Sequence, residues 1–308
     1  MALRLAGEGR ALRLVSRPSS TTSVAPPRGA NIEVVEADLG DEAAWARLIQ
    51  DAAAIVHLSA RTDLRAAEAD PAGDEMLNVA PVRALVRAAE KAEIPPTVVF
   101  ASTVTVFGPR HANPANERTR DNPCSVYDRH KITCETLLHE ATTAVTLRAC
   151  TLRLANVYGF GGASVNSNRG ILNVMMRRAL AGEALTVYGE GAYIRDFTHL
   201  DDVVDAFARA ADGGPKLCDG SHYVIATGRG YSLVEAYRLI ADAAFAATGR
   251  RVEIKHVPEP ADLHPIERRN FVGNSALYQQ RSGWRPGISL AEGVGRYFAA
   301  ETVRRAAV

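Results

Sequence analysis

The sequence predicts an α/β fold built on a doubly wound parallel sheet, with helices on both faces and a smaller second domain. Short runs that are almost wholly apolar recur along the first half of the chain, as is typical of buried parallel strands. Amphipathic runs with helical periodicity separate them, which indicates alternating strands and helices. After Gly159 this alternation gives way to a loop rich in Gly, Asn and Ser, and the region from Arg251 onward is punctuated by prolines. The change indicates an interleaved C-terminal domain.

Each apolar run is expected to form a strand. The expected strands span residues 12–15, 31–35, 53–58, 97–100 and 145–154. The amphipathic runs between and after them are expected to form helices. Their expected ranges are 1–6, 41–49, 76–91, 127–142 and 171–180. Asp41 has the position of an N-cap for the second helix, and Asp201 with Asp202 is expected to cap a helix that runs to Ala211.

Composition places the chain among ordinary globular proteins. It has 308 residues, of which 47% are hydrophobic and 23% are charged, and its formal net charge is +1. This balance argues against binding to nucleic acid or to a membrane surface. The four cysteines are scattered without the spacing of metal ligands. We therefore expect reduced thiols, no metal site and a cytoplasmic location. No apolar run is long enough to span a bilayer.

A hydroxyl, a phenol and an ammonium group carry the chemistry that the sequence predicts. Thr103 follows a buried apolar run, and the carboxyl edge of a parallel sheet is where ligands bind. Tyr127 and Lys131 are four residues apart on the next expected helix, and therefore lie on one face. The lysine charge favours the phenolate form of the tyrosine, which can take a carbinol proton while a nicotinamide takes the hydride. The alternative is a solvated lysine beside a half-buried tyrosine.

Several motifs fall in the order found in one enzyme family. They are VVEADLGD, VHLSA, LNVAPVRALVRAAE, FASTVTVFG, YDRHK, LRLANVYG, LTVYGEGAYIRDFTHLDDVVDA and SGWRPGISLAEGV. On these motifs the chain resembles the NAD-dependent epimerase/dehydratase family of extended short-chain dehydrogenases/reductases, whose members act on nucleotide sugars. The resemblance runs from Met1 to about Tyr297 and implies a Rossmann-type fold. It implies a dinucleotide-binding domain in residues 1–165 and 196–230, and a substrate-binding domain in residues 166–195 and 231–308.

The resemblance also implies roles for individual residues. Thr103, Tyr127 and Lys131 would be catalytic, and Asn78 would be a structural asparagine. The residues implied in cofactor binding are Ser16, Arg17, Asp38, Leu39, Leu58, Ser59, Ala60, Tyr127, Lys131 and Ala155. Those implied in substrate binding are Thr103, Asn156, Gly170, Val187, Arg195, His264 and Arg268. Arg195 would pair with the diphosphate of a nucleotide sugar.

Simpler roles stay open for some of these residues. Arg195 could instead form an ion pair with Asp196 or Asp201, and Asn156 could be a turn former. His57, inside an expected strand, is interpreted as a core histidine and not as a ligand of any kind.

The sequence departs from the family pattern beside the active-site threonine. Dehydratases of the family carry Asp-Glu directly after it, whereas this chain has Val104 and Thr105. No carboxylic acid is therefore expected to stand ready to protonate a leaving hydroxyl group. This departure argues against dehydration and favours epimerisation or a simple oxidation or reduction.

Two further departures concern the ligands. The acidic residue that contacts the ribose of NAD is replaced by Ser16 and Arg17, which suit a 2′-phosphate, so NADP is slightly favoured over NAD. His264 replaces a substrate-binding arginine of the family, and Arg268 or Arg269 could take over its role. This second departure leaves the nucleotide sugar open.

The first residues match the end of a helix. Met1 to Gly7 correspond to the end of the first helix of a dinucleotide-binding motif. The strand and Gly-rich turn that open such a motif would need roughly fifteen residues in front of it. Two expectations follow: either the working protein starts further upstream, or this chain binds its cofactor weakly or not at all.

We therefore expect an NAD(P)-dependent nucleotide-sugar epimerase, which oxidises a sugar carbinol and returns the hydride to the other face. The alternatives are an NADPH-dependent reductase of nucleotide keto-sugars, a non-catalytic member that binds nucleotide sugars, and an enzyme of the same chemistry on a non-sugar carbonyl compound. A homodimer is expected, formed through the apolar helix faces of Val82 to Ala89 and Ile132 to Leu138.

Overall fold

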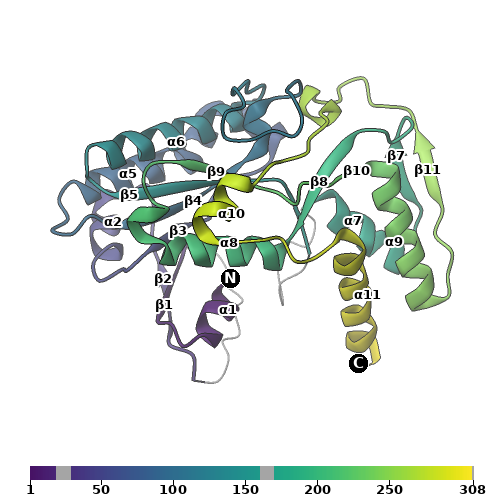
Figure 1. Cartoon of the computed structure of the whole chain (residues 1–308), viewed down its shortest axis with the longest axis horizontal. Helices are drawn as coiled ribbons and strands as arrows, with labels where there is room; N and C mark the ends of the chain where they lie inside the picture. The colour runs from purple at the N-terminus through teal and green to yellow at the C-terminus, as the bar shows by residue number, and fades with distance from the viewer. Residues whose placement is uncertain (19–28, 160–169, 307–308) are drawn as a thin grey trace. The chain divides into compact units, whose positions relative to one another are not determined.

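The computed structural model describes residues 1–18, 29–159 and 170–306, and it divides into two compact units (Figure 1). Unit 1 contains Met1–Val106, Pro123–Arg153 and Val204–Tyr223. Unit 2 contains Phe107–Asn122, Leu154–Val203 and Val224–Val308. Each unit therefore consists of three separate stretches of chain, so the two are interleaved in sequence. The predicted domain boundary at residues 165 and 166 lies outside the described residues.

The strands of the first half of the chain form two sheets, one of which also takes in a later strand, β9 (His222–Ile225). That sheet has the order β3 (Ile55–His57), β4 (Thr97–Thr103), β5 (Arg148–Leu154) and β9. The other pairs β1 (Leu12–Ser16) with β2 (Ile32–Glu36). Both the β1–β2 pair and the β3–β4 pair are parallel. The predicted α/β fold with a parallel sheet is confirmed, because apolar strands such as β4 are buried on both faces.

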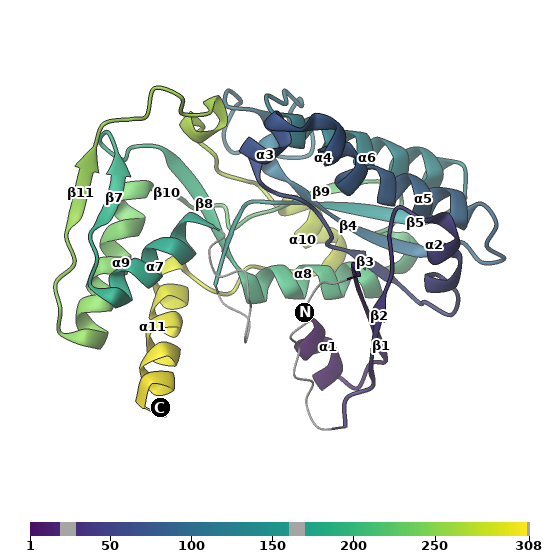
Figure 2. The same ribbon diagram turned by 180° about the vertical axis from the view of Figure 1, so that it is seen from behind.

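Helices lie on both sides of the four-stranded sheet in unit 1. Helices α4 (Pro71–Asn78), α5 (Ala80–Ala89) and α6 (Val126–Thr143) lie on one side, and the unit 1 portion of α8 (Leu200–Asp212) lies on the other (Figures 1 and 2). Helix α2 (Glu42–Leu48) packs against α5, and α5 packs against α6. Their apolar side chains meet the sheet in one buried cluster that includes Trp45, Leu85, Val98, Phe100 and Leu138.

This cluster takes up part of the dimer interface predicted on α5 and α6. Val82 and Leu85 are fully buried within the chain, and so are Cys134 and Leu138, so these side chains stabilise unit 1 itself. Ile132 and Leu137 are only partly buried, and the dimer stays a prediction.

Two local expectations need correction, and a third is confirmed. The single helix predicted over residues 76–91 is two helices, α4 and α5, because Pro81 has no N–H to continue the first helix. The strand predicted from Val145 begins at Arg148, because Val145 has a positive φ of 61° and forms a turn. Asp41 caps α2 as predicted, since its side chain accepts a hydrogen bond from the amide of Ala43.

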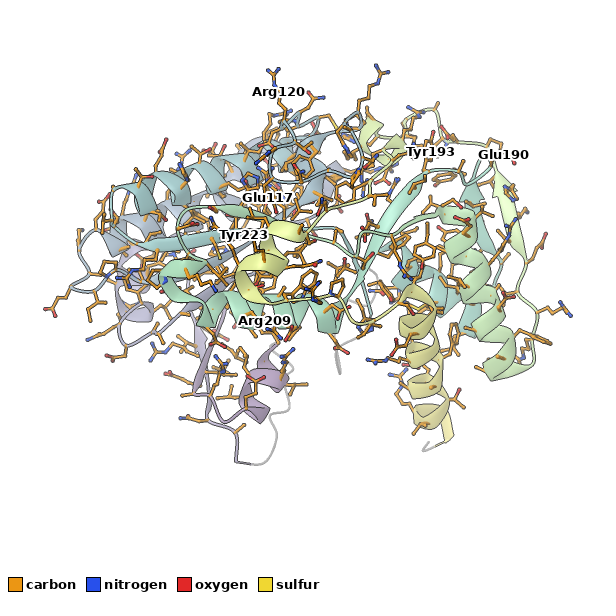
Figure 3. The ribbon with its side chains drawn as sticks, viewed as in Figure 1. Glu117, Arg120, Glu190, Tyr193, Arg209 and Tyr223 are labelled. Atoms are coloured by element: carbon orange, nitrogen blue, oxygen red, sulfur yellow. The ribbon has the colours of Figure 1, made fainter. Side chains whose placement is uncertain are left out.

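The remaining helices of unit 1 are short. They are α1 (Ala2–Gly7), α3 (Leu64–Ala69) and the 3₁₀ turn η2 (Gly214–Lys216). Ion pairs hold the N-terminal residues against α8. Arg4 shares the carboxylate of Asp205 with Arg209, which is labelled in Figure 3, and Arg10 makes a bidentate pair with Asp212.

Unit 2 has its own core around three helices. These are α7 (Ile171–Ala181), α9 (Leu233–Thr248) and α11 (Leu290–Ala306). They pack against two small sheets, one with the order β10 (Gly230–Ser232), β8 (Ile194–His199) and β6 (Asn156–Tyr158), and one that pairs β7 (Leu185–Tyr188) with β11 (Ile254–Val257). Helix α10 (Ala276–Ser282) and two 3₁₀ turns, η1 (Val104–Phe107) and η3 (Pro265–Arg268), complete the described elements.

Asp202 holds the SGWRPG segment and does not cap a helix. Helix α8 begins at Leu200, so Asp201 and Asp202 lie inside its first turn, contrary to the prediction. The carboxylate of Asp202 accepts hydrogen bonds from the amides of Gly287 and Ile288, and its carbonyl oxygen accepts one from the Trp284 indole. This carboxylate therefore fixes the chain that leads into α11.

Across residues 1–18, 29–159 and 170–306, no helix combines the length and apolar character that crossing a membrane requires. In the same residues, no group of three or more His, Cys, Asp or Glu side chains is placed to hold a metal ion.

Candidate active site

Thr103 is the last residue of β4, at the carboxyl end of a buried strand. The chain turns directly into η1, which brings the next threonine back onto it. The Thr105 amide donates a hydrogen bond of 3.2 Å to Thr103 Oγ1, and the two hydroxyl oxygens are 2.8 Å apart. The predicted position of Thr103 at a strand end is correct, and Thr105 is its immediate partner.

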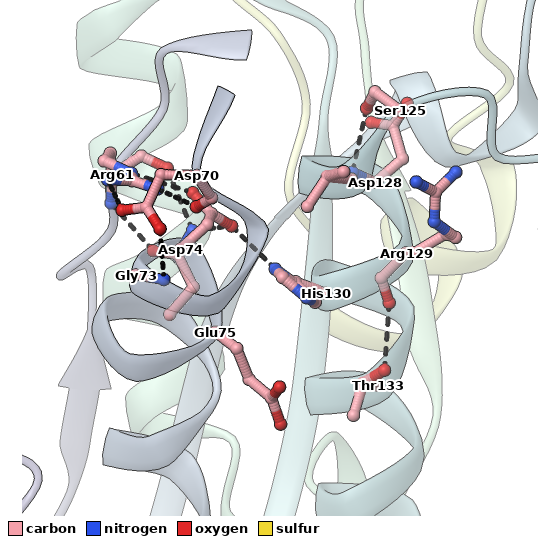
Figure 4. A network of polar contacts seen from close by, with 12 residues as sticks. Arg61, Asp70, Gly73, Asp74, Glu75, Ser125, Asp128, Arg129, His130 and Thr133 are labelled. Carbon is pink, nitrogen blue, oxygen red and sulfur yellow. Dashed lines mark hydrogen bonds and ion pairs between the residues drawn. The ribbon is translucent and has the colours of Figure 1, made fainter. Parts of the chain in front are cut away.

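Tyr127 and Lys131 lie one turn apart near the start of α6. Ser125 caps this helix by accepting a hydrogen bond from the Asp128 amide, which places Tyr127 in the first turn (Figure 4). Lys131 Nζ lies 5.7 Å from the centre of the Tyr127 ring and 4.5 Å from that of Phe100. The same ammonium donates a 2.8 Å hydrogen bond to the carbonyl oxygen of Ala101, on the strand that ends at Thr103. Lys131 is therefore buried between the helix and β4, which excludes the alternative of a solvated lysine.

Burial changes the titration of this lysine. Desolvation lowers the pKa of Lys131 from its usual 10.5 to about 8, although nearby Glu135 and Asp74 favour the charged form. The ammonium therefore keeps its charge at neutral pH, beside the ring of Tyr127.

A buried carboxylate lies beside the threonines, and the sequence prediction missed it. Thr105 Oγ1 donates a 2.5 Å hydrogen bond to Oδ1 of Asp128, which is fully buried. Asp128 accepts a hydrogen bond here and does not donate one, so the expectation that no carboxylic acid stands ready to protonate a leaving hydroxyl group stays a prediction. A local signal was available: Asp128 directly follows Tyr127 in the first turn of a capped helix, which returns to the end of β4.

A second polar cluster fixes α6 against α4 and the loop after β3 (Figure 4). At its centre is Asp74, which is 0% exposed. Its carboxylate accepts hydrogen bonds from Arg61 and Asn78, and it pairs with the ring of His130 at 2.7 Å. Asn78 also bonds both the amide and the carbonyl of Arg61, so it has the structural role that the resemblance implies. The cluster therefore fixes the position of His130, the residue directly before Lys131 on α6.

The residues implied in cofactor binding follow the carboxyl ends of strands in unit 1. Ser16 ends β1, and Arg17 after it is exposed. Asp38 and Leu39 follow β2; Asp38 is exposed and accepts a bond from the Gly40 amide, whereas Leu39 is buried. Leu58, Ser59 and Ala60 follow β3.

Two observations at these strand ends fit a bound dinucleotide. Leu58 is 51% exposed, which leaves an apolar side chain at the surface. Buried Ser16 Oγ has no hydrogen-bond partner within the described part of the chain, and a ribose hydroxyl would satisfy it. These residues fit a dinucleotide, although their contacts with one stay a prediction.

His57 is a core residue, as predicted. Its side chain is 4% exposed and stacks on Trp45, with Phe100 on its other side. Burial lowers its pKa from 6.5 to about 4, and the charge of Lys131 acts in the same direction.

Unit 2 contains two buried arginines in contact with each other, and one of them, Arg269, lies beside Asn156. Arg269 donates a 3.1 Å hydrogen bond to the side-chain oxygen of Asn156. Arg195 is 2% exposed and donates to the carbonyl oxygens of Ile194, Glu267 and Arg269. Burial lowers the pKa of Arg195 to about 9, and the neighbouring positive charge of Arg269 adds to the shift. Because the two positively charged guanidinium groups lie close together and away from water, the binding of an anion beside them would be favourable.

Within the part of the chain that the structure describes, Arg195 forms neither of the ion pairs that the sequence left open. Asp196 accepts its hydrogen bonds from Thr227, Gly228 and Gly273, and Arg195 pairs with Glu267 at 3.7 Å.

The other residues implied in substrate binding lie in different settings. Arg268, with 44% of its side chain exposed, pairs with Glu259, so Arg269 and not Arg268 lies beside Asn156. His264 caps η3 by accepting from the Ile266 amide. Gly170 precedes α7, and Val187 is buried in the unit 2 core. Ala155, which was implied in cofactor binding, is buried and donates its amide to the carbonyl oxygen of Ile225. Their roles in binding stay predictions.

Comparison with known proteins agrees with this arrangement. Residues 1–226 match the model of the NAD dependent epimerase/dehydratase family. The chain belongs to the NAD-dependent epimerase/dehydratase family. Membership makes it an enzyme of the NAD-dependent epimerase and oxidoreductase type, with the Rossmann fold of the extended short-chain dehydrogenases/reductases.

Three members of the family illustrate the similarity. The chain is 31% identical over 269 residues to a UDP-glucose 4-epimerase of Mycolicibacterium smegmatis, which covers 86% of this chain and 81% of that protein. It is 27% identical over 301 residues to a dTDP-L-rhamnose 4-epimerase of Burkholderia thailandensis, and the match covers 85% of this chain and 79% of that protein. The crystal structure of a UDP-glucose 4-epimerase from Thermotoga maritima with UDP-glucose superposes with a TM-score of 0.84 at 26% identity, covering 99% and 94%.

Proposed function

We propose that the chain is a nucleotide-sugar epimerase that oxidises one sugar carbinol and returns the hydride to the opposite face of the ketone. The observation that carries this proposal is the position of Lys131, buried next to the Tyr127 ring and bonded to the strand that ends at Thr103. Membership of the family and the epimerases among its relatives support the same reaction.

Each of the three residues has one task in this proposal. Tyr127 Oη takes the proton of the carbinol and later gives a proton back to the ketone oxygen. Lys131 stabilises the negative phenolate oxygen with its charge. Thr103 forms a hydrogen bond with the reacting substrate oxygen and keeps it in place. NAD, when bound, supplies the hydride acceptor and donor, and Ser16, Asp38, Leu39, Leu58, Ser59, Ala60 and Ala155 would hold it.

Unit 2 supplies the proposed diphosphate site. Arg195 and Arg269 would face the phosphate groups, with Asn156 as the polar neighbour of Arg269. Gly170, Val187, His264 and Arg268 stay proposed substrate contacts from the resemblance. UDP-glucose is the first substrate to test, because the relatives named above include UDP-glucose 4-epimerases.

The proposed cofactor is NAD, in line with the name of the family. NADP is the alternative, because exposed Arg17 after Ser16 offers a positive charge to a 2′-phosphate. The ratio of the dissociation constants of NAD and NADP, measured for the wild type and for Arg17→Ala, decides between the two cofactors. Loss of NADP binding alone in the variant would favour the reductase, which uses NADPH once per turnover. We also propose a homodimer and a cytoplasmic location, and sedimentation of the purified chain tests the first.

The decisive experiment is turnover of UDP-glucose in the presence of NAD, followed by NMR of the sugar product. We expect the 4-epimer to form and Tyr127→Phe to abolish its formation, because the variant has no proton acceptor. Tyr188→Phe, at a half-exposed tyrosine in β7, is the matched control and should retain full activity. Activity that survives in Tyr127→Phe would refute the assignment of the proton acceptor.

A further inference from the structure

We propose that Asp128 is a positioning residue of the reaction, which acts through Thr105 to set the direction of the Thr103 hydroxyl. This inference rests on the proposed function, in which Thr103 binds the reacting oxygen. Three groups form one line of hydrogen bonds. Asp128 Oδ1 lies 2.5 Å from Thr105 Oγ1, which lies 2.8 Å from Thr103 Oγ1. The line joins the end of β4 to the first turn of α6, next to Tyr127.

The direction of this line follows from counting protons. A carboxylate carries no proton, so Thr105 must use its single hydroxyl proton to donate to Asp128. The oxygen of Thr105 can then only accept, and the proton between the two threonines must come from Thr103. The Thr105 amide already donates to Thr103 Oγ1. Thr103 therefore commits its proton to Thr105 and keeps a lone pair for the substrate.

This direction distinguishes the two states of the substrate. In the complex in which Tyr127 still carries its own proton, the alcohol oxygen accepts from Tyr127 and can donate its proton to the lone pair of Thr103, whereas a ketone oxygen can only accept. To donate to the ketone, Thr103 must give up its bond to Thr105. The Asp128 carboxylate thus weakens the hold of Thr103 on the ketone and favours the alcohol at equilibrium. Epimerisation needs a keto-sugar that is not tightly bound through its ketone oxygen, because the sugar must turn and present its second face to the reduced cofactor.

The length of the Asp128–Thr105 bond supports a charge-assisted contact. Hydroxyl-to-carboxylate bonds of 2.5–2.7 Å are typical of an ionised acceptor. The acceptor is withdrawn from solvent, since Asp128 is fully buried, and the donor Thr105 is half-buried. Ser125, which bonds the Asp128 amide, fixes the backbone on which the carboxylate stands.

The test measures how much reduced cofactor accumulates when the enzyme is saturated with NAD and UDP-glucose, because each ketone formed leaves one reduced nicotinamide. Thr105→Val keeps the shape of the side chain and removes the acceptor, so Thr103 can donate to the ketone. We expect the reduced fraction to rise about 5- to 10-fold, as the gain of one net hydrogen bond implies. Thr105→Ser, which restores the hydroxyl, should return it to the wild-type level.

A second readout needs neither substrate nor cofactor. The proton in the short Asp128–Thr105 bond should give a downfield hydroxyl resonance in the NMR spectrum of the chain. Thr105→Val and Asp128→Asn should both remove this resonance, and Thr105→Ser should keep it. Its absence in the wild type would overturn the proposed line of hydrogen bonds.

The outcomes separate this inference from the proposed function. If Thr103→Val is inactive while Thr105→Val accumulates no more reduced cofactor than the wild type, the role of Asp128 is refuted and the reaction stands. If Thr103→Val turns over normally, the proposed function fails and the role of Asp128 fails with it. Equal thermal midpoints of the wild type and the Thr105 variants show that the effect does not come from unfolding.

Discussion

The guanidinium group of Arg269 donates a hydrogen bond to the side-chain oxygen of Asn156 over 3.1 Å, inside unit 2. Its neighbour Arg268 is exposed and paired with Glu259. Two adjacent arginines of one segment thus have opposite environments, which separates a candidate phosphate ligand from a surface residue.

Replacing Arg269 should weaken substrate binding more than it slows the reaction. For Arg269→Lys we expect the KM for UDP-glucose to rise about 10- to 100-fold with a smaller change in kcat, because a lysine keeps the charge and loses the planar set of donors. Steady-state kinetics of the purified variant measure both constants. Arg285→Ala, at an exposed arginine bonded to Gln279, is the control. A larger rise of KM in Arg268→Ala would instead favour the residue chosen from the sequence.

Activity should fall on the alkaline side as Lys131 loses its proton. The pKa of this lysine is about 8 in the folded chain, so the charge beside Tyr127 is present below that pH and lost above it. The kcat of the wild type should therefore decline above about pH 8. Lys131→Arg keeps a charge that does not titrate in this range and should move the decline to higher pH. An unchanged pH profile in this variant would show that another group controls the decline.

The stability of unit 1 should decrease in mild acid because of His57. Its pKa is about 4 in the folded chain and 6.5 when unfolded. Between these values the unfolded chain binds a proton that the folded chain refuses, so the free energy of unfolding falls as the pH decreases from 6.5 to 4. The loss should approach about 3 kcal/mol. Urea unfolding at pH 7 and pH 4.5 measures it.

His57→Phe tests this assignment, because it keeps a ring against Trp45 and Phe100 and removes the titrating group. The variant should lose much less stability on acidification than the wild type. His256→Gln, at an exposed histidine, should behave like the wild type. The same loss in His57→Phe would assign the acid sensitivity to other groups.

Asp202→Asn should destabilise the C-terminal segment of the chain. The two carboxylate oxygens accept hydrogen bonds from the amides of Gly287 and Ile288, whereas an asparagine side chain has only one oxygen that can accept. We expect a loss of about 1–3 kcal/mol in the free energy of unfolding, as for a hydrogen bond to a charged group. Asp201→Asn changes an exposed neighbour in the same turn and is the matched control. Equal effects of both substitutions would mean that the acidic turn acts through its charge.

The features predicted correctly from the sequence are those encoded locally. The apolar run that ends at Thr103 forms β4, and the spacing of four residues places Tyr127 and Lys131 on one face of α6. Both depend on neighbours in the chain, so periodicity and strand ends were sufficient to find them.

The features that were missed depend on contacts between distant segments. Thr105 meets Asp128 across 23 positions, and Asn156 meets Arg269 across 113. Some buried apolar side chains of α5 and α6 were assigned to a partner, because periodicity shows that a face is apolar without showing what covers it. Only the packing of unit 1 decides that these side chains cover each other.

The Asp74 cluster has a consequence for the motions of unit 1. One buried carboxylate binds Arg61 after β3, Asn78 at the end of α4 and His130 on α6. If any one of these segments opens, the buried carboxylate loses a hydrogen-bond partner, and if the loop of Arg61 opens it also loses its ion pair. Amide hydrogens of the loop after β3 and of the first turns of α6 should therefore exchange with solvent in a single cooperative opening, so the strand ends and the Tyr127 helix loosen together.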